Sequence, residues 1–264
     1  MLFNKILITD KNELISHKEK IFQLFASTYD CPIDEDLWNW AYIENPNGSP
    51  IVSLYYDNEK LIGHYAVIPI KLENKNNKNI RAVLSMTTMV EASYRKFGIF
   101  IAQANEVYEK AQNIGYKLVF GFPNKKSAPG FRKRLNWTLE EDLYVAKLNK
   151  NELVNIKSSI NKNSLKFNTY DEKNLQWRLN KPNQEYIKRD KNILKKFGNE
   201  FDIVYSGGNF KTLDASLEYN ILITQEFNKF IKQKKFKYIF GYRLFDKSLK
   251  GLSLKKDLIM SDVF

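Results

Sequence analysis

Apolar residues in the first half of the chain follow two periods, one typical of helices and one typical of strands. Ile21 and Leu24 lie on one side of an amphipathic helix predicted over about residues 18–29, and Asp34 can cap a second helix. A longer helix is predicted over about residues 98–113. The strand-like runs are residues 6–8, 51–56, 61–70, 85–90, 117–122 and 139–148. This order of elements predicts an α/β (α+β) chain.

The composition of residues 149–163 separates two parts of the chain, because this segment is polar and rich in Asn, Lys and Ser. We therefore predict a first unit over residues 1–148, a linker over residues 149–163 and a second unit over residues 164–264. In the second unit the apolar pattern predicts a strand at residues 201–205, a helix over about residues 213–231 and a strand at residues 238–240.

Composition limits the classes of protein that fit this chain. Its 264 residues are 43% hydrophobic, enough for a real core, and no apolar run approaches the roughly 18–20 residues that span a bilayer. The start of the chain lacks the long apolar segment of a signal peptide, and the single Cys31 excludes a disulfide framework, so we expect a cytoplasmic protein. One cysteine and two histidines give no metal-ligand spacing, so no metal site is predicted.

The formal net charge of +12 accompanies lysines that are scattered along the chain. No helix-turn-helix, zinc-finger or RNA-binding aromatic pattern is visible, so nucleic acid is not the expected partner. A positive field still raises the encounter rate with small anions and acidic proteins.

Residues 85–137 carry the strongest chemical signal. A strand breaks at residues 91–93, and Arg95 and Lys96 precede the long helix that Gly98 opens. A helix N-terminus has unpaired N–H donors and about half a positive charge, so it can hold a phosphate or pyrophosphate. Gly98 lets an anion come close to the backbone, because no Cβ stands between them.

This segment resembles the acyl-coenzyme A signature of the GNAT N-acetyltransferase superfamily, Arg/Gln-x-x-Gly-x-Gly/Ala. Arg95 and Gly98 match that signature, and Phe100 departs from its last small position. The resemblance implies a GNAT fold, with a mixed, mostly antiparallel central sheet flanked by helices, and acetyl-coenzyme A as the co-substrate.

The similarity continues downstream and covers roughly the first half of the chain. Asn124, Ser127 and Phe131 follow the family's Asn-x-x-Ala-x-x-x-Tyr spacing, and residues 135–137 are similar to its closing Leu-Gly-Phe. The second half more loosely resembles the degenerate GNAT-like repeat of tandem acetyltransferases. We expect it to cover the open sheet edge and to shape the acceptor pocket.

The resemblance also assigns a donor site residue by residue. In the family, the strand before the pyrophosphate bend bonds the pantetheine arm, and a backbone N–H of Met89 or Val90 would polarise the thioester carbonyl. The expected donor-binding residues are Met89, Val90, Arg95, Lys96, Phe97, Gly98, Ile99, Phe100, Asn124 and Phe131.

Three residues are candidates for the chemistry. His64 has a pKa near neutrality in its free state and could take a proton from the ammonium, or it could be a structural histidine. Thr88 could bond the acceptor, or be an ordinary β-branched strand residue. Tyr144 could replace the acidic Tyr that the family has where this chain has Phe131. Water or the product ammonium could also protonate the thiolate.

The residues Trp38, Asn39, Trp40, Asn45 and Pro46, together with residues 63–65, 95–100 and 121–124, resemble a bacterial GNAT subgroup associated with surface-polysaccharide assembly. This implies N-acetylation of a small-molecule amine, an amino-sugar in nucleotide-linked form, by direct attack without a covalent intermediate. Two alternatives stay open: an acyl-carrier-protein donor, and a basic binding module with a GNAT-like fold that has lost catalysis. The sequence also leaves open whether the protein is a homodimer.

Overall fold

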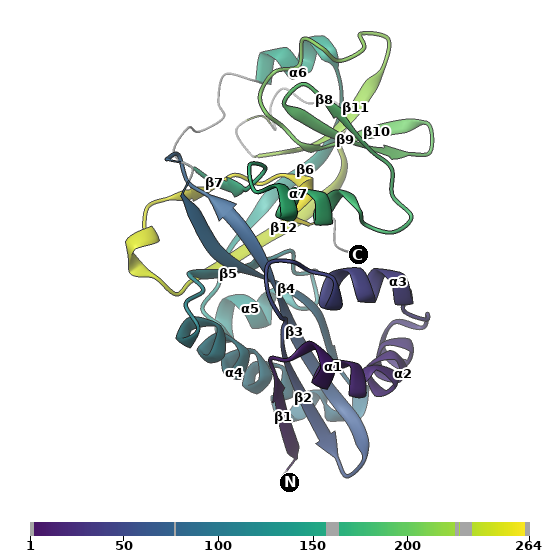
Figure 1. Cartoon of the computed structure of the whole chain (residues 1–264), viewed down its shortest axis with the longest axis vertical. Helices are drawn as coiled ribbons and strands as arrows, with labels where there is room; N and C mark the ends of the chain where they lie inside the picture. Colours follow the sequence, from purple (N-terminus) through teal and green to yellow (C-terminus); the bar gives the residue numbers. More distant parts are fainter. Residues whose placement is uncertain (1–2, 77, 157–163, 225–226, 228–233, 262–264) are drawn as a thin grey trace.

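One mixed sheet organises the chain (Figure 1). The structure is a computed structural model that describes residues 3–76, 78–156, 164–224, 227 and 234–261. In chain order the strands are β1 (Asn4–Ile8), β2 (Ile51–Asp57), β3 (Lys60–Glu73), β4 (Asn79–Val90), β5 (Leu118–Gly121), β6 (Thr138–Asn149), β7 (Ser164–Phe167), β8 (Tyr186–Arg189), β9 (Asn192–Phe197), β10 (Glu200–Tyr205), β11 (Glu218–Ile223), β12 (Lys234–Leu244) and β13 (Ser253–Leu254). Their order across the sheet is β1-β2-β3-β4-β5-β12-β6-β11-β10-β9-β8, with β7 beside β3 and β13 beside β7.

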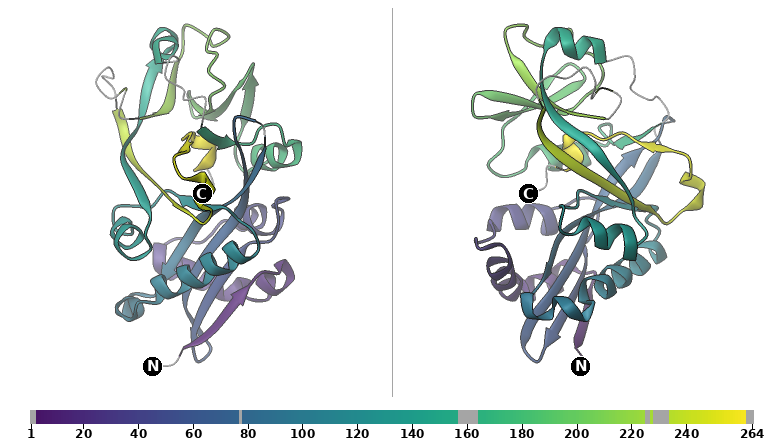
Figure 2. Two further views of the ribbon diagram at one scale, coloured as in Figure 1. Left: turned by 90° about the vertical axis from the view of Figure 1, so that its left-hand side faces the viewer. Right: turned by 180° about the vertical axis from the view of Figure 1, so that it is seen from behind.

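Helices cover both faces of this sheet. They are α1 (Lys11–Ser16), α2 (Lys18–Tyr29), α3 (Glu35–Trp38), α4 (Ile99–Asn113), α5 (Ala128–Arg134), α6 (Lys150–Ile156) and α7 (Glu172–Leu179), with a π-helix η1 (Asn39–Ile43) and 3₁₀ helices η2 (Ala92–Phe97), η5 (Lys247–Leu249) and η6 (Leu258–Met260). Figures 1 and 2 show α4 on one face of β2, β3 and β4 and the helices α1 to α3 on the other. The predicted mixed, mostly antiparallel sheet flanked by helices is confirmed, because only β4–β5, β10–β11 and β7–β13 pair in parallel among the described strands.

Local sequence explains the helices that position the site. Asp34 caps α3 by accepting a hydrogen bond from the Leu37 N–H at 3.1 Å, as the sequence predicts. In α4, Ala104, Val107 and Ala111 recur at helical spacing and are fully buried against the sheet. Gly115, just beyond this helix, has a φ of 91° and ends it in a left-handed conformation.

The predicted helix over residues 213–231 is wrong where the structure describes it. Residues 218–223 form the strand β11, which pairs antiparallel with β6 and parallel with β10. Tyr219, Ile221 and Ile223 are every second residue and lie on one buried face. This spacing is that of a strand and not of a helix. Residues 225–226 and 228–231 of that prediction lie outside the described residues.

Strand β12 connects the two predicted units. It lies in residues 164–264 by sequence, yet it pairs with β5 through Gly241 and Gly121 and with β6 on its other side. Part of the predicted linker, Lys150–Ile156, is the helix α6. The division into two units at residues 149–163 therefore stays a prediction. β12, from the second predicted unit, is inserted between two strands of the first.

A pair of tryptophans joins the two halves on the face of the sheet that carries α1 to α3. The rings of Trp40, in η1, and Trp177, in α7, stack with centroids 4.7 Å apart and an interplanar angle of 10°. Each indole N–H donates to the other residue's backbone carbonyl, at 2.7 and 2.8 Å. The guanidinium of the buried Arg178 lies 5.4 Å from the centroid of the Trp40 ring.

We expect Trp177→Phe to lower the free energy of unfolding by about 2 kcal/mol, because the buried Trp40 carbonyl loses its donor. Urea unfolding measures the loss, with Tyr170→Phe as the control, since Tyr170 is 72% exposed. A loss no larger than that of the control would contradict the role of the pair.

Candidate acyl-transfer site

The site begins where two parallel strands separate. β4 and β5 are in register at three positions, and the last pair is Leu84 with Phe120. Beyond it the strands diverge, and a cavity of about 210 Å³ lies between them. Its walls come from β4, the loop after β5, α5 and the end of α2: Tyr29, Ser85, Met86, Thr87, Thr88, Gly121, Phe122, Pro123, Asn124, Ser127, Phe131 and Trp137. We call this space the fork cavity.

A β-bulge shapes the β4 wall of the fork cavity. Between the pairs His64–Met89 and Ala66–Met86, β4 has two residues where β3 has one. Thr87, in this bulge, has a φ of 50°, a strained conformation for a β-branched residue. Thr88 is half-buried, lines the cavity and accepts a hydrogen bond from the Tyr29 hydroxyl at 3.1 Å through its carbonyl.

His64 supports this bulge from behind. It is fully buried on β3, and its Nδ1 donates to the Thr87 carbonyl at 2.7 Å. Burial lowers the pKa of His64 to about 4, although the hydrogen bond to Thr87 opposes that shift, so the imidazole is neutral at pH 7. His64 does not line the fork cavity. The geometry therefore supports a positioning role for His64 more than the predicted role of general base.

The end of β4 presents backbone groups to the open edge of the fork. The Glu91 N–H donates to the Ile62 carbonyl of β3 at 2.9 Å. Backbone groups of an antiparallel strand alternate in direction, so those of Met89 face β3 and those of Val90 face the open edge. The Val90 carbonyl there accepts a hydrogen bond from Arg95 Nε at 3.1 Å. Of the two candidate N–H donors, Val90 is the one that the ladder directs toward the fork.

The predicted pyrophosphate end lies next to that edge. η2 precedes α4, and Gly98 caps α4 with a φ of 72°. A Cβ built on Gly98 meets nothing within 4 Å, so the space above the first turn of α4 is open. Arg95 and Lys96 are exposed beside it. Unpaired N–H donors, open space and two cations fit an anionic ligand.

Three predicted donor-site residues make packing contacts and are absent from the described residues that line the fork cavity. Ile99 is buried against β2 and β3. Phe97 is 45% exposed and packs on Phe3, with ring centroids 6.0 Å apart. The Phe100 ring packs on Phe131 at 5.1 Å, which explains an aromatic side chain where the signature has a small one.

Downstream residues close the fork cavity from the β5 side. Asn124 Oδ1 accepts the N–H groups of Lys126 and Ser127, both at 2.9 Å, which shapes the turn into α5. Phe131 is buried, and its ring centroid lies 4.5 Å from that of Trp137. Asn136, where the family has Gly, has a φ of 54°, and Asn tolerates that conformation better than most residues.

Tyr144 is not brought to this site. It lies on β6, opposite Ile223 and Lys237, and packs with the hydrophobic cluster around β11. It is absent from the described residues that line the fork cavity.

The structure adds a hydrogen-bonded chain that the sequence did not reveal. Trp137 Nε1 donates to the Tyr108 hydroxyl at 3.1 Å, the hydroxyls of Tyr108 and Tyr65 are 2.7 Å apart, and Tyr65 lies 2.7 Å from Ser85 Oγ. An indole N–H can only donate. Tyr108 therefore donates to Tyr65 and Tyr65 to Ser85, the direction in which each buried hydroxyl proton has an acceptor. This leaves the Ser85 proton free to point into the cavity.

Burial raises the pKa of both tyrosines, so they stay protonated donors. Tyr65 and Tyr108 come from different elements, β3 and α4, and Trp137 precedes β6. The sequence signal that could have suggested the chain is the alternation that places Tyr65 and Ser85 toward α4.

The comparisons with known proteins agree with this geometry. Residues 10–139 match the acetyltransferase (GNAT) domain family. A GNAT-family acetyltransferase domain therefore occupies the N-terminal half of the chain. The predicted enzyme class, an acyltransferase of GNAT type, is confirmed at that level. No curated protein matches the sequence.

Several solved structures share the fold over most of the chain. A GCN5-related N-acetyltransferase from Kribbella flavida aligns with a TM-score of 0.59 and 9% identity, covering 92% of this chain and 72% of that one. A conserved protein of unknown function from Enterococcus faecalis, described as a probable N-acyltransferase, has a TM-score of 0.63, 12% identity and coverages of 92% and 73%. A GCN5-related N-acetyltransferase from Anabaena variabilis has a TM-score of 0.56, 12% identity and the same coverages. At these identities the likeness concerns the fold.

Neutral His64 makes stability depend on pH. Its pKa falls from the unfolded value of 6.5 to about 4, so the unfolded chain binds the extra proton between those values. Stability is thus present above pH 6.5 and is lost as the pH falls toward 4. We expect the His64 contribution to drop by about 2 kcal/mol from pH 7 to pH 5.

Urea unfolding at the two pH values tests this expectation with His64→Asn, which keeps a donor near the Thr87 carbonyl but cannot titrate. The variant should lose that part of the pH dependence, whereas His17→Asn should keep it. If the free energy of unfolding of His64→Asn still falls by the same amount from pH 7 to pH 5, other groups cause the pH dependence.

Proposed function

We propose that the protein transfers an acetyl group from acetyl-coenzyme A to the amine of an amino-sugar in nucleotide-linked form, in surface-polysaccharide assembly. The observation that carries the acetyl-transfer part is the fork cavity, which lies between the diverging β4 and β5 and is bordered by the end of α2. The N-terminus of α4 follows β4 in the chain by way of η2. The polysaccharide role rests on the sequence resemblance alone. The buried Trp38, Trp40 and Asn45 of that resemblance belong to the core. We keep the cytoplasm as the expected compartment on the argument from the single Cys31.

The donor would lie along the open edge of β4. Its pyrophosphate takes the first turn of α4 beside Arg95, Gly98 removes steric hindrance there, and the pantetheine arm runs past the Val90 backbone into the fork. This path follows from the open space at Gly98 and from the direction of the Val90 groups.

The transfer itself is a direct attack. The neutral amine forms a C–N bond to the thioester carbonyl carbon, and the C–S bond breaks as the tetrahedral intermediate collapses. We assign Ser85 Oγ–H as the proton donor to the leaving thiolate, in place of the tyrosine that Phe131 replaces. Formation of the C–N bond leaves the nitrogen with an extra proton. Water carries that proton to the Ser85 alkoxide, so the proton that the thiol gains comes in net terms from the attacking amine. None of the described residues that line the fork cavity is Asp, Glu or His, so water takes the role predicted for His64.

The acceptor would enter from the α2 side. There Tyr29 and the Thr88 carbonyl border the cavity, and the loop after β5 leads from it toward β12. In this proposal the second half acts as a degenerate GNAT-like repeat that extends the acceptor pocket, supported by the insertion of β12 beside β5.

The first experiment measures the melting temperature with and without acetyl-coenzyme A. Ligand at 100 times its dissociation constant should add about 2.7 kcal/mol of stability.

Gly98→Val should weaken donor binding at least about tenfold, because its side chain fills the open space above α4.

Gly115→Val is the matched control, since Gly115 has a φ of 91° at the opposite end of α4 and carries a similar backbone strain. Equal donor affinity in both variants would overturn the pyrophosphate assignment. No shift for the wild type at millimolar acetyl-coenzyme A would favour an acyl-carrier-protein donor.

Ser85→Ala should lower kcat by about 10² or more, since positioned proton donors contribute at least that much. Tyr65→Phe should give a smaller loss, because Ser85 keeps its proton but loses the group that orients it. An acetyl thioester of a more acidic thiol should reduce the defect of Ser85→Ala, because that leaving group needs less protonation. A defect that is independent of the leaving thiol would assign Ser85 to structure.

A further inference from the structure

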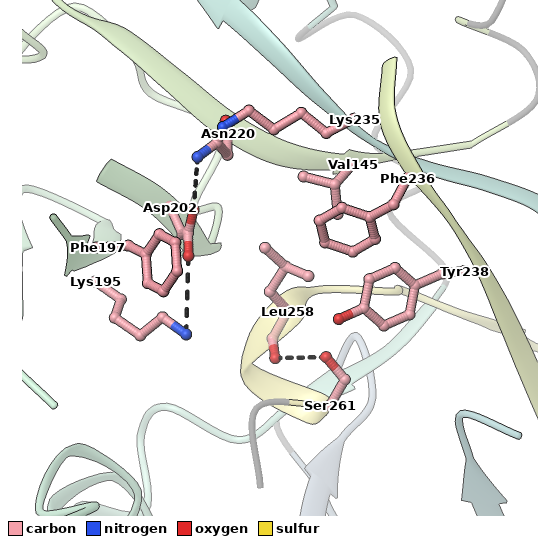
Figure 3. Close-up of a pocket in the computed structure, with 10 residues that line it drawn as sticks. All are labelled: Val145, Lys195, Phe197, Asp202, Asn220, Lys235, Phe236, Tyr238, Leu258 and Ser261. Atoms are coloured by element: carbon pink, nitrogen blue, oxygen red, sulfur yellow. Dashed lines mark hydrogen bonds and ion pairs between the residues drawn. The ribbon is translucent and has the colours of Figure 1, made fainter. Parts of the chain in front are cut away.

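A second cavity lies in the C-terminal half, about 290 Å³ in volume, between β9, β10, β11, β6, β12 and η6 (Figure 3). We call it the distal cavity. Figure 3 shows Phe197 of β9 on one side and Phe236 and Tyr238 of β12 on the other, with Leu258 between them. Phe197 is 66% exposed and Phe236 50% exposed. Large aromatic side chains left open on two sides of a cavity favour a flat ring between them.

Asp202 and Asn220 form part of the polar wall of the distal cavity. Asn220 is 3% exposed, and its Nδ2 donates to Asp202 Oδ1 at 2.8 Å and to Glu200 Oε2 at 3.0 Å. Its Oδ1 has no partner among the described residues. This oxygen is itself buried, so the Asn220–Asp202 pair, and not the free Oδ1, is what the wall presents.

The charged side chains here are already paired. Lys195 lies 3.7 Å from Asp202, and Lys235 forms an ion pair with Glu200. The distal cavity is therefore close to neutral and suits an uncharged ring better than a phosphate.

A third cavity of about 530 Å³ connects the distal cavity to the fork cavity. It shares Phe236 and Tyr238 with the distal cavity. It shares Phe122, Pro123 and Asn124 with the fork cavity. Aromatic rings mark the path, with centroids 5.2 Å apart for Phe236 and Tyr238 and 5.6 Å apart for Tyr238 and Phe122.

The connecting cavity differs in charge from the distal one. Lys125 and Lys237 line it, and both are exposed. Lys237 Nζ lies 3.8 Å from Asp142 Oδ1, a long ion pair. Glu141, the acidic residue of its lining, is paired with Arg132. This part can accept negative charge.

The three cavities share lining residues and so lie next to one another. We infer that the distal cavity binds the base of a nucleoside diphosphate whose amino-sugar reaches the fork cavity, with the diphosphate beside Lys125 and Lys237. This inference rests on the proposed function and adds the part of the protein that would recognise the nucleotide. The base packs against Phe197 and the β12 aromatics, beside Leu258.

Calorimetric titration of the full chain with uridine diphosphate tests the inference. Saturating acetyl-coenzyme A is present, so that the α4 N-terminus is occupied. Phe236→Ala and Phe197→Ala should each weaken binding about tenfold, in the range of lost base stacking. Tyr170→Ala is the control, because Tyr170 is 72% exposed and lies outside the three cavities.

Equal affinity of the wild type and both phenylalanine variants would overturn the inference. So would inorganic pyrophosphate competing as well as uridine diphosphate, since the ring would then add nothing. If acetyl-coenzyme A raises the melting temperature but uridine diphosphate does not bind, the nucleotide site fails and the acetyltransferase stands. If neither acetyl-coenzyme A nor uridine diphosphate binds, the proposed function itself is contradicted.

Discussion

The site depends on two glycines that face each other across β5 and β12. Gly121 and Gly241 are paired in register, and the Trp137 indole lies over both of them. A Cβ on Gly241 would lie 2.8 Å from Trp137 Cε3, and one on Gly121 would lie 3.4 Å from Trp137 Cη2. A larger residue at Gly241 would clash with Leu139 Cδ2 and with the indole, so one or both side chains would have to move.

The position of Trp137 in turn determines the chemistry of the fork cavity. Its ring forms part of the cavity wall against Phe131, and its N–H begins the hydrogen-bonded chain to Ser85. A donor-only group at the buried end gives the chain a single direction, and aligned hydrogen bonds reinforce one another. Two residues without side chains thus leave room for the indole that starts the hydrogen-bonded chain to Ser85.

Strand β12 also links the second half of the chain to the strands that border the fork cavity. It provides Gly241 next to the fork and Phe236 and Tyr238 next to the distal cavity, so one strand borders both ends of the proposed acceptor path. The stacked Trp40 and Trp177 fix the two halves on the face that carries α1 to α3. Displacing the second half would therefore disturb both the sheet and the acceptor side.

The sequence by itself determined the GNAT-type order of elements, the α4 helix and its glycine-opened N-terminus, because these follow from local periodicity, caps and turn residues. It failed at β11, where a helix was predicted although Tyr219, Ile221 and Ile223 alternate with the strand period of two. β6 and β10 provide the partners that make this segment a strand. Only the tertiary structure decided that His64 is buried behind the bulge, that Tyr144 lies far along the sheet from the fork lining, and that Ser85 faces the cavity. Burial, strand pairing across more than 100 residues and hydrogen-bond direction are properties of the assembled sheet, and no local pattern in the chain contains them.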